Sequence, residues 1–217
     1  MNTSPWLTAI ATLGIVASYE GWLAMAQRRT PQRLARTAHA SLREDWFAAI
    51  SAQPGSEILA VQTLRNSLMS ATMTASTAVL GLMGALSLTA PTLHATLGDA
   101  ATGIAAWPHF TPRLAMELVL LCLLFASLVA SVMAVRYYNH AGFIGSMPVG
   151  SPQRRRWGAT GTAYVRKAGW LYSWGLRQLM LLVPVVAFLL HPLAGVAGAM
   201  VMVIALIQFD RYRIENE

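Results

Sequence analysis

Five long apolar stretches constrain this chain more than any other feature of its sequence. A helix that crosses a bilayer needs about 20 mostly apolar residues, because the hydrocarbon is roughly 30 Å thick and each residue rises 1.5 Å. Hydrophobic residues make up 55% of the 217 residues, and charged residues make up only 12%. A soluble fold would be left with large apolar patches, so this composition excludes a soluble enzyme, and it excludes a disordered chain as well. The sequence therefore predicts an all-α helical bundle in a membrane.

The apolar region at residues 172–209 is too long for one crossing. Its 38 residues would extend about 57 Å as a single helix. Pro192 removes a main-chain donor and disfavours helix at His191, so we expect a break there. This gives five spans in a single membrane domain covering residues 1–217. The spans are predicted at residues 6–25, 67–89, 114–135, 172–190 and 193–209.

Basic residues test this arrangement, because they are enriched on the cytoplasmic side of membrane proteins. Six of the 16 Lys and Arg residues fall between the first and second spans, seven between the third span and the cytoplasmic end of the fourth, and two after the fifth, which leaves only Arg113 on the other side. The pattern predicts an outer N-terminus, a cytoplasmic C-terminus and a multi-pass protein of the bacterial inner membrane. Residues 27–66 and 136–171 then form cytoplasmic segments with helical extensions. The formal net charge of +7 reflects orientation and anionic headgroups, not a nucleic-acid ligand.

Local signals divide the first cytoplasmic segment. Residues 32–50 are predicted to form an amphipathic helix at the membrane surface. Pro54 and Gly55 break the chain after it. We expect Ser56 to cap the next helix, which becomes the second span and meets no breaker before Pro91.

The second cytoplasmic segment is expected to begin with a loop, because glycines and a proline gather at 142–150. Ser151 and Pro152 then start a helix that can run into the fourth span, and three glycines at 158, 161 and 169 leave a break in it open. Arginines near the boundaries are expected to contact anionic lipid headgroups. These are Arg28, Arg29, Arg154, Arg155 and Arg156.

Small and hydroxylated residues form a stripe along the second predicted span. They are spaced by 3, 4, 3, 4 and 3 positions, so they share one side of a helix. Such a stripe lets helices pack closely, or it lines a water-filled pore, and both alternatives stay open. The stripe comprises Ser67, Ser70, Thr74, Thr77, Gly81 and Gly84.

Glu20 is the only charged residue in the first predicted span. An ionised carboxylate at that depth needs a partner or water. Arg65 and Arg177 lie near the same cytoplasmic boundary and are its natural partners. The alternatives are a structural ion pair and a gate or an ion or proton site.

Three separated motifs resemble one known family. They are Gln62, Arg65 and Asn66 before the second span, Arg136, Tyr137, Asn139 and His140 after the third, and Gly175, Arg177, Pro184 and Asp210 towards the end. Over residues 46–210 they resemble bacterial and plant membrane proteins catalogued as domain of unknown function number 599. That family is uncharacterised, so the resemblance implies a shared structural or functional unit and brings no activity.

The chain carries no recognisable catalytic, cofactor or metal-binding motif. We expect neither an enzyme nor a cofactor, because a membrane enzyme would have only Glu20, His140 and the arginines to work with. The leading hypothesis is a homo-oligomeric channel or passive permeation pathway for an ion or small solute. It rests on the stripe, on Glu20, and on a basic inner mouth of Arg65, Arg136 and Arg177. The rival is a non-transporting scaffold or accessory subunit that docks lipid and protein partners.

Overall fold

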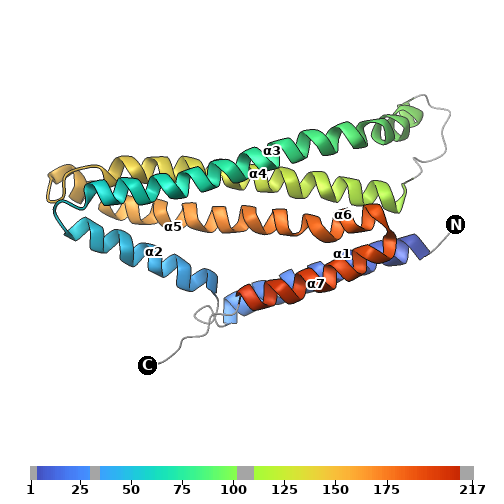
Figure 1. The fold of residues 1–217 in the computed structure, drawn as a ribbon, viewed down its shortest axis with the longest axis horizontal. Helices are drawn as coiled ribbons and strands as arrows, with labels where there is room; N and C mark the ends of the chain where they lie inside the picture. The colour runs from blue at the N-terminus through green and yellow to red at the C-terminus, as the bar shows by residue number, and fades with distance from the viewer. Residues whose placement is uncertain (1–3, 30–34, 102–109, 211–217) are drawn as a thin grey trace. The chain divides into compact units, whose positions relative to one another are not determined.

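A computed structural model describes residues 4–29, 35–101 and 110–210, and it gives side chains for all of these except 96–101. The regular elements within these ranges are all helices, which confirms the all-α prediction (Figure 1). They are α1 (Ser4–Arg29), α2 (Ala35–Ala52), α3 (Glu57–Ala101), α4 (Pro112–Gly145), α5 (Pro152–Met180), α6 (Leu182–Leu190) and α7 (Pro192–Asp210).

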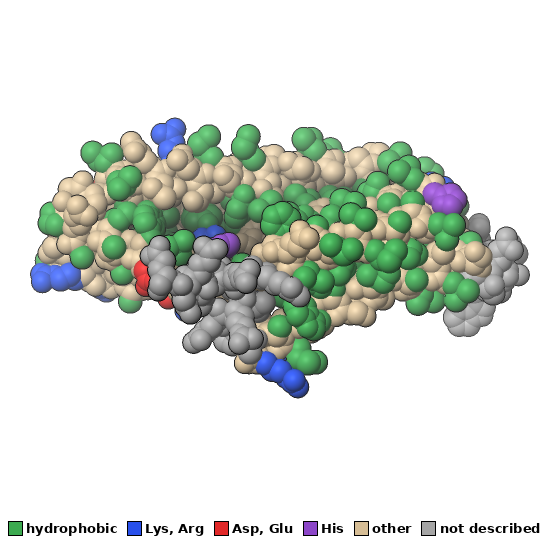
Figure 2. All heavy atoms as spheres, turned by 60° about the horizontal axis from the view of Figure 1, so that its bottom comes forward, with side chains coloured by type: hydrophobic (Ala, Val, Ile, Leu, Met, Phe, Trp, Pro, Cys, Tyr) green, Lys and Arg blue, Asp and Glu red, His purple; other side chains and the backbone are tan. Residues whose placement is uncertain are grey.

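Five helical stretches in the described residues are long and apolar enough to cross a membrane, as the sequence predicts. They are α1, α3, α4, the α5–α6 pair and α7. Apolar side chains also cover much of the outer surface (Figure 2), and Leu88 and Leu190 are each 82% exposed. Such a surface is unfavourable in water and stable in hydrocarbon. By helix length and hydropathy the chain is therefore a multi-pass membrane protein.

The chain divides into two compact units, and the longer helices contribute to both. Unit 1 comprises Met1–Met25, Ala78–Ala126 and Gln178–Gln208. In its core, Met116 of α4 packs with Val185 and Phe188 of α6. Helices α1 and α7 lie side by side in this unit (Figure 1), where Tyr19 and Leu206 belong to one buried cluster.

Unit 2 comprises Ala26–Thr77, Ser127–Arg177 and Phe209–Glu217. Its core joins α2, α3, α4 and α5 through one cluster that includes Phe47, Leu64 and Tyr138. Phe47 is 1% exposed and lies against Gly161 of α5, where an added Cβ would be 2.6 Å from the ring. Phe47 thus packs α2 against α5, and only glycine at position 161 leaves room for its ring.

Two proline positions behave differently. The chain breaks at His191, with α6 ending at Leu190 and α7 beginning at Pro192, so the predicted division of the last apolar region is confirmed. The expected end of the earlier helix at Pro91 is wrong, because α3 continues through it to Ala101. The Thr89 hydroxyl near this proline donates to the Ala85 carbonyl at 2.7 Å. Proline is more frequent inside membrane-spanning helices than inside helices of soluble proteins, so its place within α3 agrees with a spanning helix.

The expected loop at 142–150 is shorter than predicted, because residues 142–145 belong to α4 and only the rest of the range forms the loop. Helix α4 runs to Gly145, and only residues 146–151 connect it to α5. Gly145 serves close packing, because a Cβ there would be 3.3 Å from Leu64 Cδ1. Gly150 has a φ of +84°, so it is the glycine in this group that a turn requires.

The cap predictions had mixed outcomes. The Arg154 N–H donates to Ser151 Oγ at 3.1 Å, so the predicted cap of α5 is confirmed. Ser56 stands at the predicted N-cap position of α3, where its carbonyl accepts the Ala60 N–H at 2.9 Å. Its hydroxyl is directed to the carbonyls of Ile50 and Gln53, so it also closes the end of α2. Helix α5 also continues past its glycines without a break.

Candidate functional site

The predicted stripe on α3 separates into two rows in the structure. Thr74 is buried, Ser67 and Gly81 are partly buried, and a Cβ at Gly81 would be 2.9 Å from Leu124 Cδ2 of α4. Members of the other row are exposed, and they lie seven positions apart. These are Ser70, Thr77 and Gly84. The stripe is therefore not one continuous surface, because one row packs within the chain and the other faces outward.

The hydroxyls of the stripe donate their protons to their own helix. Ser67, Ser70, Thr74 and Thr77 bond to carbonyls four positions earlier, at 2.9 to 3.2 Å. Such bonds satisfy each donor without a partner helix or water. The exposed oxygens of Ser70 and Thr77 therefore present only acceptor lone pairs to their surroundings.

Large apolar side chains alternate with the exposed small row. Met73 is 70% exposed and Leu80 is 71% exposed, so α3 presents the series Ser70, Met73, Thr77, Leu80 and Gly84. We call these five residues the outer α3 face. Alternating small and large residues at heptad spacing provide the holes and knobs of helix packing.

The motif residues of the sequence resemblance fall into two groups within unit 2. Arg65, Tyr138 and Asn139 line a pocket of about 320 Å³ between α3 and α4. Tyr137 and His140 instead lie against α5, with ring centroids 5.4 Å and 5.9 Å from that of Tyr164. The remaining motif residues of this region are exposed. They are Gln62, Asn66 and Arg136.

A buried ion pair that the sequence analysis did not predict joins α5 to the end of α7. Arg177 donates to both carboxylate oxygens of Asp210, with Nη1 3.4 Å from Oδ1. The two side chains are only 6% and 17% exposed. Asp210 had been noted only as the last motif position, because 33 residues separate it from Arg177. The predicted ion pair of Glu20, a partly buried residue of unit 1, stays a prediction.

Arg154 corrects the prediction that it contacts lipid headgroups, because its side chain is buried at 3% exposure. Nη1 donates to the Ile144 carbonyl in the last turn of α4, and Nη2 donates to Ser51 Oγ at 2.9 Å in the last turn of α2. The guanidinium also lies over the Phe47 ring, 5.2 Å from its centroid. Arg154 therefore connects α5, to which it belongs, with α2 and α4 through these hydrogen bonds. Four other arginines of that prediction are exposed, and their lipid contacts stay a prediction. They are Arg28, Arg29, Arg155 and Arg156.

Polar groups of unit 1 are also paired. Arg113 Nε donates to Glu117 Oε1 at 3.0 Å, four positions along the same helix, and Thr92 donates to Glu117 Oε2 at 3.1 Å. Among the residues whose side chains are described, no three His, Cys, Asp or Glu residues converge as metal ligands do. The outer α3 face and the pocket at Arg65 both present exposed groups to a partner or ligand.

Comparisons with known proteins support the resemblance that the motifs suggested. Neither a curated protein nor a solved structure matches this chain. One family model does match, and its match extends beyond the region of the three motifs to include most of α1 and α2. The chain thus belongs to the family described as "Protein of unknown function, DUF599", whose model matches residues 7–213.

Proposed function

We propose that this protein is a non-transporting, non-enzymatic membrane subunit that associates with a second copy of itself and serves as a scaffold. The observation that carries the proposal is the outer α3 face, where exposed Met73 and Leu80 alternate with smaller residues. In a bilayer no hydrophobic force drives helices together, so association depends on close packing. A face of alternating knobs and holes supplies such packing.

The outer α3 face favours association over pore lining for two reasons. Its Met and Leu side chains interrupt the hydroxyls, so it offers water no continuous polar wall. The hydroxyl protons are already donated to α3 carbonyls, as for Ser70 and Thr77. A pore lined by the remaining lone pairs would favour cations, whereas a basic mouth would favour anions. A packing role involves no such conflict.

Disulfide trapping tests the self-association. In a Cys122→Ser background, which removes the exposed native cysteine, we expect Thr77→Cys to form a disulfide-linked dimer when membranes are oxidised. Equivalent positions on a symmetric helix pair come within the roughly 4.4–6.8 Å between Cα atoms that a disulfide needs. The matched control is Thr72→Cys, an exposed threonine that bonds to its own helix in the same way but lies on another side of α3. Equal trapping at both positions, or none at position 77, would contradict the proposal.

A homo-oligomeric channel or passive permeation pathway is the second candidate, and the exposed hydroxyls of Ser70 and Thr77 favour it. It requires that these groups face water in the assembled protein. We expect cysteines placed there to resist aqueous thiol reagents, and we expect liposomes containing the protein to pass neither common anions nor cations. Rapid labelling together with ion flux would replace the scaffold proposal by the channel.

The orientation belongs to the same proposal. Basic residues on one side of the spans favour an outer N-terminus and a cytoplasmic C-terminus in a bacterial inner membrane. Four exposed arginines, Arg28, Arg29, Arg155 and Arg156, then face anionic headgroups. A reporter fused to the C-terminus should be active in the cytoplasm, and a periplasmic signal would reverse the orientation.

A further inference from the structure

The pocket at Arg65 combines one cation with apolar walls. It lies between α3 and α4 within unit 2 and has a volume of about 320 Å³. Leu64, Leu68 and Tyr138 form part of its wall, and its exposed polar members include Arg65 and Asn139. A ligand in this pocket would therefore meet a guanidinium, an amide and apolar carbon.

The cation in the pocket lacks a carboxylate partner. Among the described residues, no Asp or Glu oxygen lies within 4.0 Å of Arg65, whereas Arg166 pairs with Glu44 at 3.3 Å. An arginine with five donors that lines an open pocket is suited to an anion, and phosphate oxygens match its planar fork. Charge complementarity thus points to an anionic ligand.

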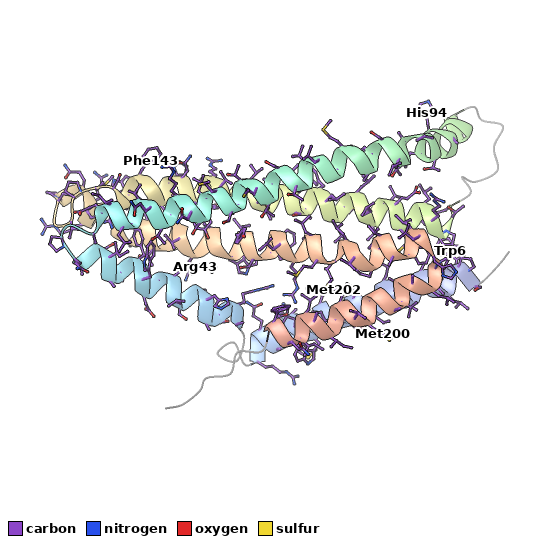
Figure 3. The ribbon with its side chains drawn as sticks, viewed as in Figure 1. Trp6, Arg43, His94, Phe143, Met200 and Met202 are labelled. Atoms are coloured by element: carbon purple, nitrogen blue, oxygen red, sulfur yellow. The ribbon has the colours of Figure 1, made fainter. Side chains whose placement is uncertain are left out.

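Apolar side chains in the pocket distinguish an amphiphile from a free anion. Leu64 and Leu68 line it close to the predicted start of the second span at residue 67. Phe143, which is labelled in Figure 3, lines it further towards the cytoplasm and is 66% exposed. A free phosphate would satisfy Arg65 and leave these side chains uncovered. A phospholipid would satisfy the guanidinium through its phosphodiester and cover Leu64 and Leu68 with its glycerol and first acyl carbons.

The level of the pocket along the helices suits a lipid headgroup. Arg65 precedes the predicted start of the second span at residue 67 by two positions, and Asn139 follows the predicted end of the third span at 135 by four. At 1.5 Å per residue, both are within about 6 Å of the expected hydrocarbon boundary. Phosphodiester groups occupy that layer of a bilayer.

We propose that the α3–α4 pocket binds an anionic phospholipid, with the Arg65 guanidinium and the Asn139 amide donating to the phosphodiester and with Leu64 and Leu68 contacting the glycerol and the first acyl carbons. The site is independent of self-association through the outer α3 face. Arg65→Gln should therefore leave disulfide trapping at position 77 unchanged, so the two proposals fail separately.

Native mass spectrometry of the detergent-purified full chain tests the site. We expect the wild type to bind phosphatidylglycerol about fivefold more tightly than phosphatidylcholine, the factor typical of one interfacial arginine. Arg65→Gln should abolish this preference, and Arg166→Gln, which removes an exposed arginine that pairs with Glu44 outside the pocket, should keep it. An unchanged preference in Arg65→Gln, or no preference in the wild type, would overturn the proposal.

Two further arms address the nature of the ligand and the folding of the variant. Millimolar inorganic phosphate should not displace phosphatidylglycerol, and displacement would show a free-anion site instead. Arg65→Lys keeps the charge and should keep part of the preference. If Arg65→Gln does not fold, Leu68→Ala decides the question, because it should weaken binding of both lipids while retaining the preference. Unchanged binding of both lipids in Leu68→Ala would show that the site does not contact lipid carbon, and would overturn the phospholipid proposal.

Discussion

Two buried arginines on helix α5 solve the same problem in different ways. Arg154 is 3% exposed near the start of the helix, and Arg177 is 6% exposed in its last turn. Burying a guanidinium costs several kcal/mol unless another group compensates its charge. Arg177 has the carboxylate of Asp210, whereas no carboxylate lies within 4.0 Å of Arg154 among the described residues. Arg154 has instead its hydrogen bonds to neutral acceptors and the more distant charge of Glu57. The two sites therefore compare a direct ion pair with neutral acceptors assisted by a more distant carboxylate.

Helix ends explain how Arg154 manages without an ion pair. Its Nη1 donates to Ile144, whose carbonyl lies in the last turn of α4, where the helix carries partial negative charge. A basic side chain at a helix C-terminus is favourable for this reason. Asp210 is in the opposite situation, because it ends α7 and adds a negative charge to a negative helix end. Arg177 thus stabilises α7 at a position where the carboxylate alone would destabilise it.

The largest expected effect comes from removing the carboxylate. Asp210→Ala leaves the buried Arg177 guanidinium without this partner, which we expect to lower the free energy of unfolding by about 3 kcal/mol. Equilibrium unfolding of the purified protein in detergent measures the loss. The double variant Arg177→Met with Asp210→Leu should regain most of it, because no charge then remains buried. A double variant as unstable as the single one would show that the pair is not what sets stability here.

Arg154 should respond less and should have no such rescue. Arg154→Met removes the donors to Ile144 and Ser51 but also removes a buried charge, so we expect a loss of about 2 kcal/mol. The same unfolding measurement applies, with Arg155→Met as the control. Arg155 is the exposed neighbour, and its substitution should stay within about 0.5 kcal/mol of the wild type. Equal effects of the two substitutions would show that helix-end capping contributes nothing at Arg154.

The contrast between these arginines also shows which features cannot be predicted from the sequence alone. Hydropathy and Pro192 were enough to predict five spans, because each is a local signal that depends only on residues close together in the sequence. The run of basic residues at 154–156 looked uniform, yet α5 turns Arg154 into the core and leaves Arg155 and Arg156 exposed. Which residue of such a run is buried depends on where the other helices lie. The pairing of Arg177 with Asp210 was unpredictable for the same reason.

Glycine was the other ambiguous signal. Gly145 suggested a loop, but it lies inside α4 and makes room for Leu64. Gly150 in the same group does form a turn at positive φ. Composition alone does not separate these two uses, because both depend on the absence of a Cβ. The stripe on α3 shows a similar limit, since its helical spacing was correct but its division between Thr74 and Thr77 followed from the position of α4.

The smallest expected effect on stability concerns the Phe47 ring beneath Arg154. Gly161 faces Phe47, and a methyl group there would be 2.6 Å from the ring, so the ring must move away from its place under the guanidinium. We expect Gly161→Ala to cost about 1 kcal/mol by overpacking. Gly158→Ala on the same helix has nothing within 4 Å of the added methyl group and should gain about 0.5–1 kcal/mol from helix propensity. The two changes should thus have opposite signs in the unfolding measurement.

Combining Gly161→Ala with Arg154→Met should lower the free energy of unfolding by less than the sum of the single effects, because both disturb the contact between Phe47 and Arg154. Strict additivity would mean that the ring and the guanidinium are energetically independent, and Arg154 would then be held by its two hydrogen bonds alone.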